Sequence, residues 1–295
     1  MAQLIDIEAV VRAKFPRQYP RVPRWVFRLA AWLICQKQMN RILIGLDGTE
    51  GTAFADGMTR ELRVSYRIEG LAHLDAADRD ATDGAGTPRG RIFVSNHPLG
   101  AFDGISYIKL FGRRYEGRFK VIVNDLLMHI VPLRPVFLPV NTMGRQRRED
   151  LEAVEAAYAD PTMQLLTFPA GFCSRWMGGR IQDVAWRDSV IKQAVRWQRD
   201  VVPLHFEGRN SVTFYAVEWL RRVCGMKFNI GLVLLPWQMM KTSRGKTYTI
   251  RVGRPIPWQT FDRSRTTAEW AAWLRAECYR LKNAEPAPGA ASRQD

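Results

Sequence analysis

The sequence predicts an α/β fold in which a largely parallel central sheet is flanked by helices. The main observation is an alternation: short runs rich in β-branched and aromatic residues are separated by segments with helical periodicity, which is typical of βαβ units. The chain has 295 residues, of which 46% are hydrophobic and 25% charged, so it can bury a sizeable core. An amphipathic helical segment precedes this alternation.

The first long element is a single helix predicted over residues 22–44. At about 100° per residue its large apolar side chains share one face. They are Val22, Trp25, Val26, Leu29, Trp32 and Leu33, and the nearby Arg21, Arg24 and Arg28 cluster beside them. Trp and Arg bordering an apolar stripe are typical of helices lying in a membrane interface. A helix packed on the core with a solvated basic edge would give the same pattern, and both interpretations stay open.

Residues 53–283 are predicted to form the α/β domain, after an N-terminal membrane-association segment over 1–52. A surface loop is expected at 72–90, where Asp, Ala and Gly show no periodicity. Strands are expected at 91–95, 119–124, 136–141, 164–169, 201–208 and 248–253, and helices at 104–111, 126–131, 147–159 and 186–199. Thr266 and Glu269 form a capping box for the last helix. The tail 284–295 lacks large apolar residues and is expected to be disordered.

The charge is strongly positive, with 44 Lys and Arg against 29 Asp and Glu and a net charge of +15. Such a field attracts nucleic acid, anionic lipid headgroups or an acidic carrier protein. Nucleic acid is the weakest of these, because the basic residues are dispersed and no aromatic stacking module accompanies them. The 4 cysteines lack CxxC spacing, which argues against a metal site and favours a reducing compartment.

No segment predicts a membrane span or a cleaved leader. Acidic residues and an arginine interrupt the apolar part of the N-terminus, which excludes a signal peptide. No run reaches the roughly eighteen uncharged apolar residues that a transmembrane helix requires. By this test the chain is not expected to cross the membrane, and any membrane contact would be peripheral.

His97 is the histidine with the strongest case for a chemical role. It follows the predicted strand 91–95, and Pro98 and Gly100 then turn the chain into the next helix. Ligands bind at the carboxyl ends of parallel strands, and Asp103 could fix the imidazole tautomer and stabilise its cation. The pair predicts a general base, and early helix amides could stabilise a developing negative charge. The histidines expected to be structural are His73, His129 and His205.

A second candidate segment follows the predicted strand 164–169. Pro169 and Gly171 form a sharp turn with close backbone access, and Arg175 could grip a phosphate or carboxylate with two hydrogen bonds. A plain turn with a solvated arginine would have the same composition. Farther along, Pro203 stands near the start of a buried strand, a position that tolerates the missing amide.

In this order and at this spacing, the segments resemble the glycerophospholipid acyltransferase superfamily, that is, the lysophosphatidate-type acyltransferases. That family carries an Asn-His motif with a following Asp, an FPEGTRS-like motif and a Val-Pro strand. Here these are Asn96-His97 with Asp103, FPAGFCSR at 168–175 and VVP at 201–203. The resemblance covers roughly residues 25–260.

Three departures from the family pattern are visible. Five residues separate His97 from Asp103, one more than usual, and Ala170 replaces the glutamate of the second motif. Where the family places a phosphate-binding arginine after a strand, this chain has Asn141, with Arg145, Arg147 and Arg148 a few residues later. These features are similar to a bacterial, hemolysin-like branch that includes lyso-ornithine and lyso-glycine lipid O-acyltransferases.

The resemblance implies an enzyme that moves a fatty acyl group from acyl carrier protein or coenzyme A to a hydroxyl of a lyso-lipid. It needs no cofactor besides that thioester co-substrate, and it works peripherally at the cytoplasmic face of the inner membrane on an anionic surface. His97 and Asp103 would be catalytic, and the substrate-binding residues would be Asn96, Gly171, Ser174, Arg175, Arg145 and Arg147. A 1-acylglycerol-3-phosphate acyltransferase and a non-catalytic peripheral lipid-binding protein remain the alternatives.

Overall fold

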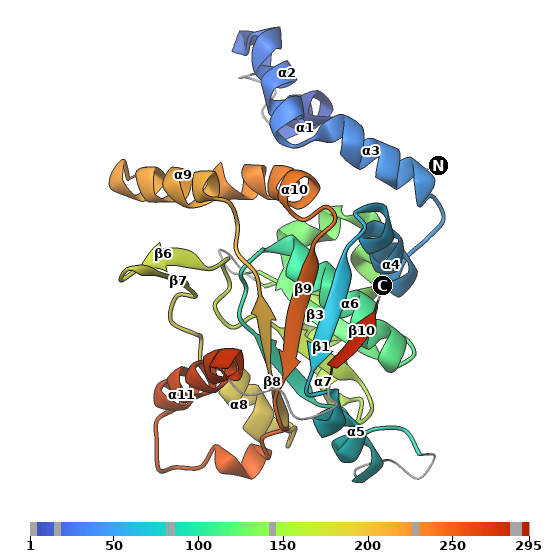
Figure 1. Ribbon diagram of the computed structural model, residues 1–295, viewed down its shortest axis with the longest axis vertical. Coiled ribbons are helices and arrows are strands. Elements are labelled where there is room, and N and C mark those ends of the chain that lie inside the picture. Colours follow the sequence, from blue (N-terminus) through green and yellow to red (C-terminus); the bar gives the residue numbers. More distant parts are fainter. Residues whose placement is uncertain are drawn as a thin grey trace.

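A computed structural model describes residues 5–14, 19–80, 82, 86–141, 146–225, 230–283 and 291–294. A central sheet with the strand order β10-β1-β9-β8-β2-β5-β3-β4 is flanked by helices (Figure 1). Its strands are β1 (Ser65–Glu69), β2 (Ile92–Ser95), β3 (Phe119–Asn124), β4 (Phe137–Val140), β5 (Gln164–Thr167), β8 (Val201–Glu207), β9 (Thr247–Val252) and β10 (Ala291–Gln294). A separate hairpin consists of β6 (Arg175–Met177) and β7 (Arg180–Gln182).

The helices in the described part of the chain cover both faces of the sheet and extend beyond one end of it (Figure 1). They are α1 (Ile7–Lys14), α2 (Arg24–Leu33), α3 (Gln36–Gly45), α4 (Gly51–Glu61), α5 (Leu71–Asp80), α6 (Ala101–Arg114), α7 (Arg148–Ala159), α8 (Ser189–Arg196), α9 (Val212–Val223), α10 (Ile230–Thr242) and α11 (Thr267–Arg280). Short 3-10 turns occur at Tyr19–Arg21, Asp125–His129, Val131–Val136, Trp258–Thr260 and Leu281–Asn283.

The pairing of the strands confirms the predicted, largely parallel α/β fold. β2 pairs in parallel with β5 and β8, and β3 pairs in parallel with β4 and β5. β9 runs antiparallel to β8, and β1 is parallel to β9. All six predicted strands are present within two residues of their expected bounds. The five parallel strands therefore end at one edge of the sheet, where ligands bind in such folds.

Two hydrophobic cores lie on the two faces of the sheet. One face packs against α4 and α6 through side chains such as Phe54 and Phe111. The other packs against α7, α8 and α11 through side chains such as Ile191 and Leu274. Strand residues of β2 alternate between the two cores, Phe93 in the first and Ile92 and Val94 in the second, because successive side chains of a strand point to opposite faces.

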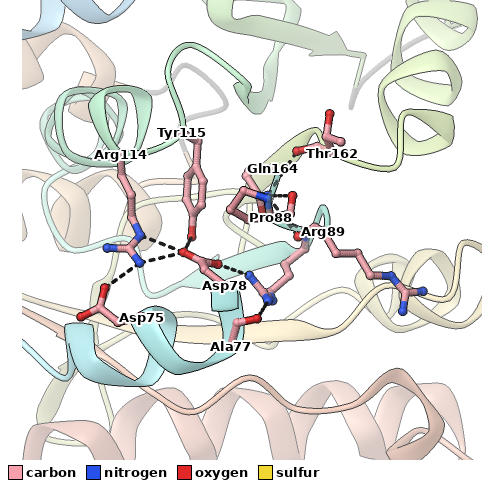
Figure 2. Close-up of polar contacts among 10 residues, drawn as sticks. Asp75, Ala77, Asp78, Pro88, Arg89, Arg114, Tyr115, Thr162 and Gln164 are labelled. Atoms are coloured by element: carbon pink, nitrogen blue, oxygen red, sulfur yellow. Dashed lines mark hydrogen bonds and ion pairs between the residues drawn. The ribbon is translucent and has the colours of Figure 1, made fainter. Parts of the chain in front are cut away.

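The expectation of a surface loop over residues 72–90 is wrong for its first part, which forms helix α5. Few apolar side chains support this helix, although Leu74 is fully buried. Ion pairs attach it to the rest of the fold. Asp78 pairs with the buried Arg91. Arg114 pairs with both Asp75 and Asp78 (Figure 2). These contacts to residues distant in sequence outweigh the weak local propensity of the segment.

The single helix expected at 22–44 is also corrected. The helix stops after Leu33, and Cys35 adopts a left-handed conformation with φ of 51° before α3 begins. The Cys35 side chain is buried in the first core, as is Ile42 in α3, so the break lets the chain turn back onto the domain. The helix expected at 126–131 is a 3-10 turn at Asp125–His129.

The C-terminal tail was expected to be disordered over residues 284–295. Residues 291–294 instead pair antiparallel with β1, so the expectation is wrong for these four residues. The rest of the tail lies outside the described residues. The expected start of the α/β domain at residue 53 falls inside α4, which begins at Gly51 and packs on α6.

Candidate active site

The structure brings the predicted histidine and aspartate together at the end of β2. The Nδ1 atom of His97 lies 3.0 Å from Oδ1 of Asp103, which stands in the first turn of α6. Six positions along one helix would place the two side chains on different faces. The two side chains meet because the chain bends between the strand and the helix. Gly100 makes this bend with a φ of 79°, a left-handed conformation that favours glycine.

The carboxylate of Asp103 is held from several sides. Its side chain is fully buried, the Leu99 amide donates to Oδ2 at 3.0 Å, and the Gly104 amide donates to Oδ1 at 3.0 Å. Backbone donors therefore fix the orientation of the carboxylate, which in turn fixes the orientation of the imidazole.

The environment makes His97 more basic than an ordinary histidine. Burial lowers its pKa, but the negative charge of Asp103, 3.0 Å from Nδ1, and the charge of Asp183 raise the pKa above the usual value. The ring packs against Phe168 with centroids 4.1 Å apart, and 18% of the side chain remains exposed. Because Nδ1 faces Asp103, Nε2 is the nitrogen that can exchange a proton with a bound molecule.

The turn after β5 docks directly on the histidine. The Ser174 amide donates to the His97 carbonyl at 2.8 Å. Gly171 has a φ of 66°, and its amide donates to the Phe168 carbonyl at 2.9 Å, so that amide closes the turn instead of facing a substrate oxygen. Arg175 follows, half-buried, with its guanidinium carbon 4.9 Å from the centroid of the Phe172 ring.

Asp183 is a site residue that the sequence analysis did not find. Its buried carboxylate accepts hydrogen bonds from the Ser174 hydroxyl at 2.6 Å, the Trp186 indole at 3.0 Å and the His97 amide at 3.3 Å. Burial raises its pKa, although these hydrogen bonds oppose the shift. The residue follows β7 with no motif around it, so only the fold shows that it joins the two loops of the site.

Asn96 holds the histidine loop in place. Its side-chain amide donates to the Phe206 carbonyl at 3.0 Å and accepts from the Phe206 amide at 2.7 Å. The buried side chain thus extends the pairing of β2 and β8 past the end of the strand. Asn96, Gly171 and Ser174, all expected to bind substrate, have hydrogen-bonding groups committed to the protein itself.

Arg145 and Arg147 were also expected to bind substrate, but no contact in the described part of the chain joins them to the His97 site. Arg145 lies outside the described residues. Arg147 stands before α7 with its side chain 71% exposed and pairs with Glu149 at 2.7 Å. It follows β4, three strands from β2 in the sheet order, which corresponds to about 14 Å at the usual strand spacing.

Of the three histidines expected to be structural, His73 and His205 have contacts or burial within the fold, whereas His129 is exposed. His73 Nδ1 lies 3.0 Å from the Val252 carbonyl. His205 is buried in β8, and burial, with a contribution from Arg251, lowers its pKa to about 4. His129 is exposed at the end of its 3-10 turn. Among the described residues, no cluster of His, Cys, Asp and Glu could hold a metal ion, and no helix has both the length and the apolar character needed to cross a bilayer.

The chain is similar in sequence to known acyltransferases. The model of a family described as acyltransferase matches residues 9–288. A lyso-glycine lipid O-acyltransferase of Phocaeicola vulgatus is 38% identical over 278 residues, covering 94% of this chain and 95% of the relative. A lyso-glycine lipid O-acyltransferase of Bacteroides thetaiotaomicron is 37% identical over 278 residues, covering 94% and 97%. The solved 1-acyl-sn-glycerophosphate acyltransferase of Thermotoga maritima superposes with a TM-score of 0.45 at 13% identity, covering 89% of this chain and 95% of that one.

Proposed function

The chain belongs to the acyltransferase family, and we propose that it transfers a fatty acyl group from a thioester to a hydroxyl of a lyso-lipid, with His97 as general base. The observation that carries the proposal is the 3.0 Å approach of His97 Nδ1 to the buried Asp103 at the carboxyl end of β2. The pair suits base catalysis, because one imidazole nitrogen lies beside a buried carboxylate and 18% of the histidine side chain remains exposed.

The proposed reaction is a direct displacement. Nε2 of His97 removes the proton from the acceptor hydroxyl while the oxygen attacks the thioester carbonyl carbon. The carbon–sulfur bond of the tetrahedral intermediate then breaks, and the proton passes from the imidazolium to the departing thiolate. Asp103 stabilises the imidazolium in between, and base catalysis of this kind contributes about 10²–10⁴-fold to a rate. The products are the acylated lipid and the free thiol of coenzyme A or of acyl carrier protein.

We propose a lyso-aminoacyl lipid, such as lyso-glycine lipid, as the acceptor. The two relatives at 38% and 37% identity are named for that substrate. Ala170 is buried where lysophosphatidate acyltransferases carry a glutamate, so this position contributes no negative charge next to an anionic headgroup. Arg175, one residue beyond Ser174, would bind the headgroup carboxylate, a group that suits the planar guanidinium.

The proposed location is peripheral, on the cytoplasmic face of the inner membrane. α2 exposes Trp25 at 64%, Leu29 at 46% and Trp32 at 63% of their surfaces. Arg24 and Arg28 are exposed on the same helix, and the whole chain carries a net charge of +15. Trp rings at headgroup depth with cations beside phosphates would hold this helix on an anionic bilayer. The same positive field would attract an acidic carrier protein.

The function is tested by a product assay with separate donors and acceptors. Purified protein is incubated with labelled acyl carrier protein thioester or acyl coenzyme A, and with lyso-glycine lipid, lyso-ornithine lipid or 1-acylglycerol-3-phosphate. The products are then identified by mass. We expect the label in an O-acylated lyso-aminoacyl lipid together with release of one thiol. Binding of these lipids with no consumption of either thioester would refute the proposal and favour a lipid-binding protein.

A further inference from the structure

Helix α9 presents an apolar face to solvent. Val212 is 84% exposed, Trp219 58%, Leu220 52% and Val223 65%. At about 100° per residue these four side chains lie within roughly 100° of one another, so they form one stripe. A helix on the surface of a soluble domain normally turns its polar side outward.

The side chains on the inner side of α9 already have contacts within the protein. Phe214 and Tyr215 are buried against the domain, and the buried Glu218 pairs with Arg221 at 3.2 Å. The outward stripe is therefore not the core face of a displaced helix. A contiguous exposed apolar face of this kind indicates a surface that is covered by a membrane or by a partner.

The β6–β7 hairpin continues the apolar surface. Trp176 is 52% exposed, and together with Met177 and Gly178 it faces Trp219 and Val223 of α9 across a groove of about 560 Å³. Figure 1 shows α9 and the hairpin side by side, and β6 contacts α9. The groove is thus lined by side chains from both elements.

Both walls of this groove are attached to the histidine loop. The Ser174 amide, directly before β6, donates to the His97 carbonyl at 2.8 Å. The Asn210 side chain, two residues before α9, donates to the Pro98 carbonyl at 2.9 Å. Each of the two elements that line the groove is therefore held by a hydrogen bond from its preceding residues to the loop that carries His97.

We propose that the outward face of α9 and the β6–β7 hairpin dock on a lipid bilayer, as a second membrane contact in addition to α2. Helix α10 links α9 to the N-terminal helices, because it contacts α9, α2 and α3. In Figure 1 these helices lie together beyond the end of the sheet to which β8 points. Exposed cations at its margins, Arg209 before α9 and Lys241 in α10, would meet lipid phosphates.

The inference rests on the proposed lipid acceptor and extends it. A bilayer on this surface would place the groove at the membrane, and the alkyl chain of a lyso-lipid would then approach along the two elements whose preceding residues are hydrogen-bonded to the His97 loop. A second copy of the chain would cover the stripe equally well, but it would also block that approach. The connection of both groove walls to the His97 loop therefore favours the bilayer.

The test uses the full chain and vesicles of phosphatidylcholine, with and without phosphatidylglycerol. The docking variant is Val212→Ser with Leu220→Ser, which leaves the groove-lining residues in place. The matched control is Leu151→Ser with Val195→Ser, which removes two apolar side chains that are 50% and 40% exposed on α7 and α8. We expect the docking variant to bind vesicles about tenfold or more weakly and the control to bind like the wild type. Turnover of a monomeric, short-chain lyso-lipid should be unchanged in both.

Wild-type vesicle binding by the docking variant would overturn the proposal. A wild-type dimer in light scattering that the docking variant converts to monomers would also overturn it, because a second copy would then occupy the surface. If the double variant lost its helical circular dichroism, the single variant Leu220→Ser would replace it in the vesicle-binding assay, with the same expected loss of binding. Failure to acylate any acceptor would refute the proposed acyltransferase function. The vesicle-binding comparison would still test whether α9 and the β6–β7 hairpin dock on a bilayer.

Discussion

Replacing Asp103 with asparagine removes a negative charge that lies 3.0 Å from His97 Nδ1. At an effective dielectric constant of about 20, two opposite unit charges at this distance attract by roughly 5 kcal/mol. Solvent at the exposed edge of the ring reduces the attraction, but about 1.4 kcal/mol is enough to move a pKa by one unit. We therefore expect the pKa of His97 to fall by at least about one unit in Asp103→Asn.

The assay is the pH dependence of kcat/KM with a fixed thioester and lyso-lipid. In the wild type the rate should rise with pH as His97 loses its proton, through an apparent pKa above the ordinary histidine value. In Asp103→Asn that rise should move to lower pH. The plateau should fall by about 10²-fold or more, because the imidazole is no longer held in the required tautomer.

Asp262→Asn makes the same chemical change in an exposed carboxylate on another part of the surface, and it should leave the profile unchanged. If Asp103→Asn kept the wild-type kcat/KM at high pH, Asp103 would not be needed to hold the imidazole. If the rise of kcat/KM with pH stayed at the wild-type pH, the charge of Asp103 would have no influence on the pKa of His97.

Three further predictions concern other groups. Asp183→Asn removes a negative charge near His97 and weakens the hydrogen bond that the Ser174 hydroxyl donates to residue 183. We expect kcat/KM to fall about tenfold and the rise of kcat/KM with pH to move to lower pH. A lower kcat/KM whose pH dependence is unchanged would show that Asp183 has only a structural role. His205 is neutral in the fold, with its pKa lowered to about 4, so the free energy of unfolding should fall by about 3 kcal/mol as the pH falls from the unfolded pKa near 6.5 through 4. Urea titrations of wild type and His205→Gln should differ in that pH range, and parallel curves would contradict the assignment. Arg175→Ala should raise KM for an anionic lyso-lipid more than it lowers kcat, and an unchanged KM would exclude Arg175 from headgroup binding.

The sequence predicted the sheet and the histidine–aspartate pair because both depend on short-range signals. Strand β2 and the first four residues of β8 are short apolar runs, which is how buried parallel strands look in a sequence. The His97–Asp103 contact also follows from a short segment, since one bend at Gly100 is enough to bring the two side chains together.

The missed features depend on contacts between residues distant in sequence. Helix α5 is stabilised by ion pairs from Asp75 and Asp78 to arginines on other elements, and its own sequence resembles a loop. Asp183 reaches the site only because the β6–β7 hairpin folds back on the histidine loop. Neither contact leaves a periodic or motif signal in the sequence.

The most direct test of the central claim is the turnover of His97→Ala with acyl thioester and lyso-glycine lipid. His129→Ala is the control, because that histidine is exposed in a 3-10 turn and has no part in the proposed mechanism. We expect His97→Ala to keep the wild-type circular dichroism and to lose at least about 10²-fold in kcat, whereas His129→Ala should keep full activity. Full activity in a folded His97→Ala protein would contradict the claim that this imidazole is the base.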